Sequence, residues 1–214
     1  MWQGKTKAVT FSFDDGVLQD AVIIEILNKY GLKATFNLNS GLLGTDRYLK
    51  NYGRPIEHFK IQKENVKQAY AGHEVAVHTL THPNLTTLDE QEIIRQVEED
   101  RKALEELVGY KIVGMAYPCG GVNNDDRVAE IIRKNTPIKY SRTIASSYSF
   151  KKQENLLRFN PSAHLMEWDK VFELVDKFLN ETSGEPSLLY LWGHAYEKDI
   201  QDEFLGNFEK ICQM

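Results

Sequence analysis

The chain alternates along its whole length between segments typical of buried strands and segments typical of amphipathic helices. The expected strands are short runs rich in β-branched and aromatic residues, at 7–13, 33–39, 74–77, 111–117, 138–144 and 187–192. Segments with apolar residues at helical spacing lie near 17–30, 64–70, 90–108, 125–134, 169–179 and 202–212. This alternation is typical of a parallel α/β sheet with helices outside it, either open or closed into a barrel. No linker, repeat or low-complexity run interrupts it, so we expect a single domain over 1–214.

Residues 45–72 are the least regular part of this pattern. They contain turn-like and aromatic stretches, and the helix at 64–70 closes the excursion. A long insertion between core elements often lies over a functional site, and a plain surface loop is the alternative. His58 and His73 are expected to be ordinary surface or loop residues rather than metal ligands.

Composition disfavours several classes of protein. The formal net charge of -5 and the pI of about 5.7 predict no binding to nucleic acid or to an anionic membrane surface, because either needs a basic patch. Two cysteines, Cys119 and Cys212, are too few for a disulfide framework. The sequence shows no membrane-spanning stretch and no signal segment. We expect a cytoplasmic protein if Met1 is the native start, and an extracellular or periplasmic one if a leader has been removed.

Two adjacent carboxylates, Asp14 and Asp15, end the first expected strand and are followed by Gly16. Successive strand side chains point to opposite faces, but a glycine lets the backbone turn at the strand end. Both carboxylates can therefore reach one cleft. Taken alone, the pair is more simply explained as a polar turn or as the N-cap of the following helix.

Histidines lie at two other strand ends, with His78 and His82 after the third strand and His194 after the last. Two imidazoles and one carboxylate make a three-ligand site that leaves a position open for water, as in catalytic zinc sites. If Asp15 is that carboxylate, Asp14 is free to act as a general base, and His194 is the candidate for a second proton-transfer group. Polar loop histidines and a hydrogen-bonded histidine at a strand terminus are the alternatives.

Four motifs in this order resemble the polysaccharide deacetylase family, carbohydrate esterase family 4. They are Phe13-Asp14-Asp15-Gly16, His78-Thr79-Leu80-Thr81-His82, the proline-containing strand end Ala116-Tyr117-Pro118-Cys119-Gly120, and Leu191-Trp192-Gly193-His194. The resemblance covers nearly the whole chain. It implies a distorted, incomplete (β/α) barrel with its site at the C-terminal ends of the strands. It also implies metal-dependent hydrolysis of an acetyl group, usually from an N-acetylated sugar and sometimes from an O-acetylated one.

The resemblance also implies roles for individual residues. Asp14 resembles the catalytic base and His194 the catalytic acid. The metal triad of the family matches Asp15, His78 and His82. The implied cofactor is one divalent metal ion, with Zn²⁺ first and Co²⁺ or Ni²⁺ as alternatives. Cys119 follows the motif proline, so its backbone N–H resembles the donor to the oxyanion, and Leu191 would line the pocket for the acetyl methyl group.

The sequence departs from the family pattern in two places. The third motif usually carries an arginine that steadies the base, but Ala116 stands there, and Cys119 replaces an aromatic residue. Arg142, near the end of the fifth strand, is a candidate replacement for the arginine, while an ordinary surface arginine is the slightly favoured interpretation. The fourth motif, which tunes the acid histidine, is not clear, and the nearby candidates for it are His164, Trp168 and Asp169.

Four aromatic residues are candidates for a sugar-stacking wall: Tyr117, Trp168, Trp192 and Tyr196. For Tyr117 and Trp192, burial in the barrel core is the alternative. Cys119 also raises the alternative of a nucleophilic thiol, which needs a neighbouring base and a lowered pKa. Its sequence neighbours, Pro118 and Gly120, supply neither.

The leading prediction is a metal-dependent deacetylase that acts on an acetylated sugar or a related small amide. A second enzyme hypothesis is hydrolysis of another C–N bond, such as a cyclic amide, without metal; the altered third motif favours it. A third is an inactive carbohydrate-binding relative that kept the fold. The presence of both Asp14 and His194 argues against this third hypothesis, because binding alone needs neither.

Overall fold

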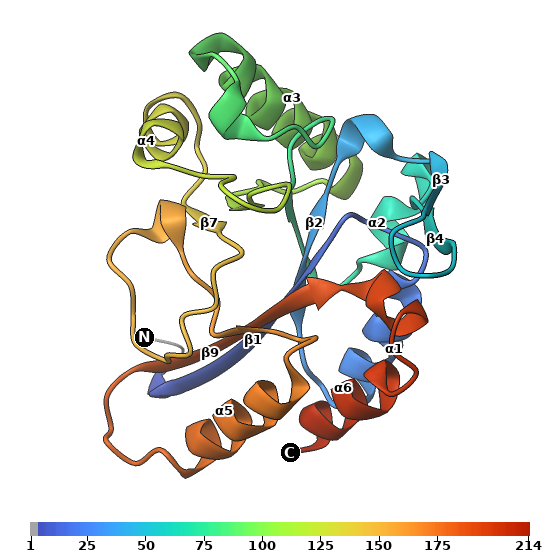
Figure 1. Ribbon diagram of the computed structural model, residues 1–214. Coiled ribbons are helices and arrows are strands. Elements are labelled where there is room, and N and C mark those ends of the chain that lie inside the picture. Colours follow the sequence, from blue (N-terminus) through green and yellow to red (C-terminus); the bar gives the residue numbers. More distant parts are fainter. Residues whose placement is uncertain (1–3) are drawn as a thin grey trace.

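The computed structural model describes residues 4–214, which form a curled sheet with helices on its outside (Figure 1). Within these residues the strands are β1 (Lys7–Asp14), β2 (Ala34–Leu38), β3 (Asp46–Leu49), β4 (Ile56–Phe59), β5 (Glu74–Val77), β6 (Gly114–Ala116), β7 (Tyr140–Arg142), β8 (Ala163–His164) and β9 (Ser187–His194). The helices are α1 (Asp20–Lys29), α2 (Val66–Ala69), α3 (Glu90–Val108), α4 (Asp126–Asn135), α5 (Trp168–Asn180) and α6 (Phe204–Gln213), with short 3-10 turns such as η5 (Leu156–Arg158) and η6 (Ala195–Asp199).

Seven strands form one parallel sheet in the order β7-β6-β5-β2-β1-β9-β8. The two edge strands, β7 and β8, share no ladder within residues 4–214, so the barrel is incomplete. A single parallel bridge joins Arg142 of β7 to Phe159, on the chain between these two edges. The expected fold class, a distorted and incomplete α/β barrel, is confirmed.

Strand β1 shows why the sequence alternates between aromatic and polar residues here. Phe11 and Phe13 point outward, and both rings contact Phe208 of α6, with centroids 5.5 and 5.6 Å apart. Ser12 and Asp14 alternate with them and so face the barrel interior. Burying each phenylalanine contributes roughly 1.5–3 kcal/mol. The outer face of β1 therefore holds the helices, and its inner face is left for polar groups.

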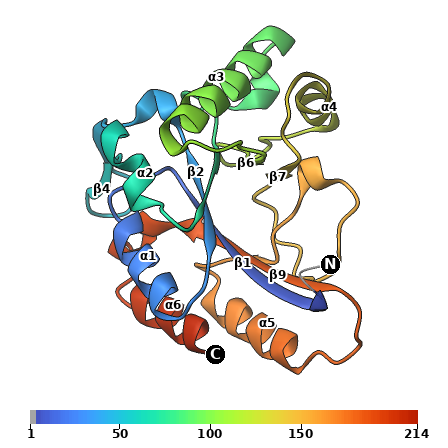
Figure 2. The ribbon, with the colours of Figure 1, turned by 180° about the vertical axis from the view of Figure 1, so that it is seen from behind.

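Local signals place both ends of α3 where the sequence predicted them. The Asp89 side chain accepts a hydrogen bond from the Glu92 backbone N–H at 2.9 Å and caps α3, and Gly109 ends that helix with φ +84°. Figure 2 shows α1, α6 and α5 covering the outside of the sheet beside β1 and β9. No helix among residues 4–214 combines the length and the apolar character needed to cross a bilayer.

The irregular excursion contains an antiparallel hairpin, β3–β4, that the sequence did not predict. Its strands have four residues each, and half of these residues are exposed, so the strands are too short and too polar to be marked by an alternating apolar pattern. The Leu18 N–H donates to the Phe59 carbonyl at 2.9 Å, and the Ile61 N–H donates to the Gly16 carbonyl at 2.9 Å. These bonds hold the hairpin against the turn that follows β1.

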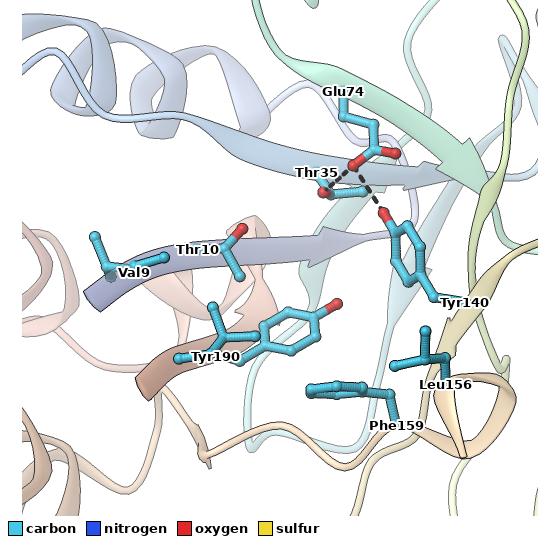
Figure 3. Close-up of a pocket in the computed structure, with 10 residues that line it drawn as sticks. Val9, Thr10, Thr35, Glu74, Tyr140, Leu156, Phe159 and Tyr190 are labelled. Atoms are coloured by element: carbon cyan, nitrogen blue, oxygen red, sulfur yellow. Dashed lines mark hydrogen bonds between the residues drawn. The ribbon is translucent and has the colours of Figure 1, made fainter. Parts of the chain in front are cut away.

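A cavity of about 490 Å³ lies inside the barrel at the amino ends of the strands (Figure 3). Its walls are mostly apolar and aromatic. The Glu74 carboxylate lies among them and accepts hydrogen bonds from the Thr35 and Tyr140 hydroxyls, each at 2.7 Å. The predicted site residues follow the carboxyl ends of the strands, so this cavity is at the opposite end of the barrel from them.

Candidate active site

A second cavity, of about 270 Å³, lies at the carboxyl ends of the strands and collects most of the predicted site residues. Its lining comprises Asp14, Asp15, Arg47, Leu49, His58, His78, His82, Tyr117, Cys119, Gly120, Ile144, Trp192, His194 and Tyr196. The parallel register explains the gathering, because Asp14 at the end of β1 pairs with His194 at the end of β9. Residues 180 positions apart in the chain thus come to one edge of the sheet.

Asp14 is a buried carboxylate that is held by two side chains. Its Oδ1 accepts a hydrogen bond from Asn37 Nδ2 at 2.8 Å, and both of its oxygens contact Nη2 of Arg142. Burial alone would raise the pKa of Asp14. The positive charge of Arg142, its hydrogen bond and the charge of His194 outweigh burial and leave this pKa below its ordinary value. Asp14 is therefore ionised at neutral pH, as a general base requires.

The interpretation of Arg142 as a surface arginine is wrong, because its side chain is 0% exposed. Arg142 is the register partner of Ala116 on the neighbouring strand β6, the position where the family pattern has its arginine. The small Ala116 side chain leaves this level of the barrel interior open to a longer side chain from β7. There the guanidinium also contacts Ser12 Oγ at 3.1 Å and stacks on the Trp192 ring at 4.3 Å.

Asp15, His78 and His82 each offer a ligand atom, and these atoms lie within 4.8 Å of one another. His78 Nδ1 donates to the Ala116 carbonyl at 2.9 Å, which leaves His78 Nε2 unprotonated and available as a ligand. Burial lowers the pKa of His78. The pKa of His82 is lowered to about 4 by burial and by electrostatic repulsion from the nearby His78 ring. Both imidazoles are therefore neutral at pH 7. Two neutral imidazoles and one carboxylate form a donor set that suits Zn²⁺.

The backbone at the site adopts the left-handed region, which non-glycine residues rarely occupy. Asp15 has φ +85°, His82 has φ +62° and Cys119 has φ +69°. Such conformations cost of order 1–3 kcal/mol each and persist where the surrounding structure imposes them, which is often at functional sites. Pro83 follows His82, and both histidines lie in the irregular segment between β5 and the next 3-10 turn rather than on a helix.

The hairpin brings two further residues to Asp15 that the sequence analysis did not assign. His58 Nε2 lies 3.0 Å from Asp15 Oδ2, and Lys60 Nζ lies 3.1 Å from Asp15 Oδ1. Burial would raise the pKa of Asp15, but the Lys60 charge and the His58 hydrogen bond more than offset it and hold this pKa well below the ordinary value. Lys60 also donates to Asn39 Oδ1 at 3.1 Å.

The expectation of a surface or loop residue is wrong for His58, which is buried and lies in strand β4; His73 lies in a loop as expected, although it too is buried. His58 contacts Asp15 directly, whereas His73 lies outside this cavity and its Nδ1 accepts a hydrogen bond from the Ala34 backbone N–H at 3.2 Å. A histidine two positions before a lysine, in a segment without clear periodicity, carries no local signal of such a contact. The hairpin pairing and its docking create it.

His194 is paired with a carboxylate that the sequence analysis missed. Glu197 Oε1 lies 2.9 Å from His194 Nδ1 and 3.0 Å from His164 Nε2, and Glu197 Oε2 accepts from the His194 backbone N–H at 3.1 Å. Burial alone would lower the pKa of His194, but the hydrogen bond and charge of Glu197 raise it to about 9. The same contacts hold the pKa of Glu197 at about 2 in spite of burial. His194 is therefore a protonated acid at neutral pH.

Of the three candidates for the fourth motif, one contacts the pair formed by His194 and Glu197. His164 shares the Glu197 carboxylate with His194. Trp168 instead donates from Nε1 to Gln201 at 2.7 Å, and it and Asp169 do not line the cavity. The residue that does pair with His194 follows it by only three positions, in η6, so a histidine with a glutamate at this spacing was the available signal.

Cys119 has the features of a backbone donor rather than of a nucleophile. Burial and the nearby Asp15 charge raise the pKa of its thiol, and the thiol donates to the His82 carbonyl at 3.4 Å. A reactive cysteine has a lowered pKa instead. Within residues 4–214 the Cys119 backbone N–H donates to no acceptor, and the residue lines the cavity.

Aromatic side chains form much of the remaining wall. Tyr117, Trp192 and Tyr196 line the cavity, and all three are buried. The Trp192 Nε1–H is a buried donor that has no partner among the described residues. Leu191, which was expected to line the acetyl pocket, does not line the cavity. It alternates with Trp192 along β9 and lies in the apolar core instead.

Comparison with known proteins identifies sequences and folds that resemble this chain. Residues 3–136 match the family described as Polysaccharide deacetylase. Peptidoglycan-N-acetylglucosamine deacetylase PgdA of Listeria monocytogenes is 30% identical over 128 residues, which are 59% of this chain and 24% of that protein. Peptidoglycan-N-acetylmuramic acid deacetylase PdaC of Bacillus subtilis is 26% identical over 123 residues, which are 56% and 23%. The chain thus spans about a quarter of the length of these curated relatives.

Solved structures share the fold at lower identity. A family 4 carbohydrate esterase from Streptomyces lividans, in complex with acetate, aligns over 96% of this chain and 85% of its own, with a TM-score of 0.57 and 15% identity. The Streptococcus pyogenes deacetylase PplD, also in complex with acetate, aligns over 70% of this chain and 61% of its own, with a TM-score of 0.56 and 22% identity.

Proposed function

The chain belongs to the polysaccharide deacetylase family, and on this premise we propose that it is a metal-dependent hydrolase that removes the acetyl group from an N- or O-acetylated sugar. One observation carries the proposal. An ionised carboxylate, a protonated histidine and a group of three side chains that could hold a metal ion line one cavity of about 270 Å³. Hydrolysis of an amide or ester needs a base, an acid and an electrophile, and this cavity offers a residue or residue group for each.

The ligand group proposed for the metal is Asp15, His78 and His82, with Zn²⁺ as the first candidate. The two neutral imidazoles and the ionised carboxylate fit a divalent ion without further proton loss. A bound divalent ion supplies Lewis acidity toward an acyl oxygen and lowers the pKa of water. The Ala116 carbonyl, which accepts from His78 Nδ1, sets the orientation of that ring.

The proton transfers are assigned to Asp14 and His194. Asp14 takes a proton from the water whose oxygen bonds to the acetyl carbonyl carbon. The bond from that carbon to the sugar nitrogen or oxygen then breaks, and His194 donates its proton to the leaving atom, so that acetate and a free amine or hydroxyl result. Arg142 keeps Asp14 oriented and ionised, and Glu197 keeps His194 protonated.

Two hydrogen-bond donors at the cavity are proposed to bind oxygen atoms of the substrate. The Cys119 backbone N–H is proposed to stabilise the negative charge that develops on the acetyl oxygen, and removal of one such donor typically costs ~10²–10³ in rate. The Trp192 Nε1–H, buried without a partner among the described residues, would be satisfied by an oxygen of the sugar. Tyr117 and Tyr196 offer apolar ring surface to the sugar.

An inactive, carbohydrate-binding protein is the competing function, because the fold also occurs in structures described as family 4 pseudoenzymes. The buried pair of Asp14 and Arg142 argues for catalysis. Removing two charges from water costs several kcal/mol per ion, and sugar binding gives no reason to maintain them.

The test combines metal analysis of the purified protein with release of acetate from N- and O-acetylated sugars. We expect about one equivalent of a divalent metal, loss of hydrolysis after chelation, and recovery with Zn²⁺ or Co²⁺. Asp15→Ala and His78→Ala should lose both metal and activity. His73→Ala, which removes a buried histidine outside the cavity, is the matched control and should keep both. Sugar binding without acetate release by metal-loaded protein would refute the proposal.

A further inference from the structure

The β3–β4 hairpin presents one face to the cavity. Arg47, Leu49 and His58 line the cavity, and Arg47 is the register partner of His58. The other face turns away, and there Tyr48 packs on Phe59 with ring centroids 5.2 Å apart. Alternation along each strand thus sends Arg47 to the cavity beside His58.

Arg47 uses only part of its hydrogen-bonding capacity within the protein. Its Nε donates to His58 Nδ1 at 3.1 Å, so His58 carries its proton on Nε2 and donates it to Asp15 Oδ2 at 3.0 Å. The two terminal amino groups of Arg47 make no hydrogen bond or ion pair with any residue in 4–214. Holding the His58 ring needs Nε alone, which leaves the outer edge of the guanidinium free.

The charge of Arg47 is also unmatched, in contrast to the other cations of this region. Arg142 pairs with Asp14, Lys60 pairs with Asp15, and His194 pairs with Glu197. Asp46, the acidic neighbour of Arg47 in sequence, lies on the opposite face of the hairpin. Among the described side chains, no carboxylate lies within ion-pair distance of the Arg47 guanidinium, so the cavity presents a surplus positive charge.

We propose that Arg47 forms an anion subsite, so that the substrate is an acetylated sugar that carries an acidic group, a carboxylate or a phosphate. This inference rests on the proposed deacetylase function. A planar guanidinium with two free amino groups matches the oxygens of either group in a bidentate geometry. The cavity volume of about 270 Å³ lies just below the range typical of small-molecule sites, which gives room for one acidic sugar residue inside the cavity.

The experiment compares sugars that differ by the acidic group alone. Hydrolysis is followed with N-acetylglucosamine, N-acetylmuramic acid and N-acetylglucosamine 6-phosphate, which carry no acid, a carboxylate and a phosphate. Binding is measured by calorimetry with glucosamine, muramic acid and glucosamine 6-phosphate, which have no acetyl group to lose. The proteins are wild type, Arg47→Met, Arg47→Lys and the control Arg54→Met. Arg54 lies at the turn of the same hairpin and bonds the Asp199 carbonyl.

We expect wild type to prefer at least one acidic sugar, and the member preferred identifies the group. Arg47→Met should lower kcat/KM and affinity for that sugar about 10- to 100-fold, chiefly through KM, and leave the neutral sugar within about threefold. Arg47→Lys should restore part of the preference, because lysine keeps the positive charge but lacks the planar pair of amino groups that can bind two oxygens at once. Arg54→Met should match wild type. Metal content, measured for every variant, shows whether loss of the His58 contact has disturbed Asp15.

The outcomes separate this inference from the proposed function. Hydrolysis without preference for an acidic sugar, or equal losses for neutral and acidic sugars in Arg47→Met, overturns the anion subsite and leaves the deacetylase intact. An Arg47-dependent preference in binding without acetate release from any sugar keeps the anion subsite and overturns the deacetylase.

Discussion

Replacing Glu197 by glutamine tests the assignment of His194 as the acid. The substitution keeps an oxygen that can accept from His194 Nδ1 and removes the negative charge. That charge and its hydrogen bond raise the pKa of His194 to about 9 against the effect of burial. Without the charge we expect the pKa of His194 to fall to its ordinary value of about 6.5 or below.

The expected loss of activity depends on pH in a way that follows from these values. His194 donates a proton, so activity is present below its pKa and is lost as the pH rises through it. At pH 7.5 the protonated fraction falls from nearly complete to about one tenth, which predicts a loss of roughly tenfold in kcat/KM. At pH 6 the loss from this cause is less than about twofold. The alkaline limb of the profile should therefore move from near pH 9 to pH 6.5 or lower.

The assay is the pH dependence of kcat/KM for an acetylated sugar, together with an NMR titration of the His194 ring in the same variant. Glu209→Gln is the matched control, because Glu209 pairs with Lys29 at 2.6 Å on the surface and should leave both curves unchanged. An alkaline limb that stays near pH 9 in Glu197→Gln, while the NMR titration shows a lowered pKa, would refute the role of His194 as the acid. An unchanged NMR titration would refute the effect of Glu197 on it.

Three further predictions concern buried charge and the thiol. Arg142→Met leaves a buried carboxylate unpaired and should cost about 3–5 kcal/mol in the free energy of unfolding, measured in urea, whereas Arg133→Met on the surface should cost under about 1 kcal/mol. Lys60→Met removes the cation beside Asp15, so the metal-free variant should have a lower melting temperature than metal-free wild type. Zn²⁺ should then raise the melting temperature of the variant more than that of wild type, and an equal rise would contradict this. Cys119→Ala should keep activity within about threefold, because the proposed donor is the backbone N–H; inactivity of a folded, metal-loaded variant would favour the thiol.

Part of the site was predictable because its signals are local. Asp14 and Asp15 end a strand whose alternation of Phe and polar residues is visible in the sequence, and His78 follows a strand that begins and ends where predicted. Parallel strands bring their carboxyl ends to one edge, so the residues at those ends can be grouped from the order of strands and helices alone. Leu191 lies in the core rather than at the cavity because adjacent strand residues face opposite sides of the sheet, and Trp192 occupies the position that faces the cavity.

The partners of these residues depended on contacts between distant segments. Arg142, 128 positions from Asp14 in the chain, reaches it because Arg142 pairs in register with Ala116. The small Ala116 side chain leaves space in the barrel interior for the arginine. His58 and Lys60 reach Asp15 because a short hairpin, with half of its strand residues exposed, docks on the turn after β1.

The sequence by itself thus determined the order of the helices and of six strands of the parallel sheet, the fold class, and the group of carboxylates and histidines at the strand ends, but not the β3–β4 hairpin or the short strand β8. Periodicity, helix caps and motif spacing act over a few residues and can be recognised along the chain. The tertiary structure decided which cation or carboxylate faces each of these groups, and with it the pKa of Asp14, Asp15 and His194. Those values depend on burial and on charges a few ångströms away in space, and neither quantity is set by separation along the chain.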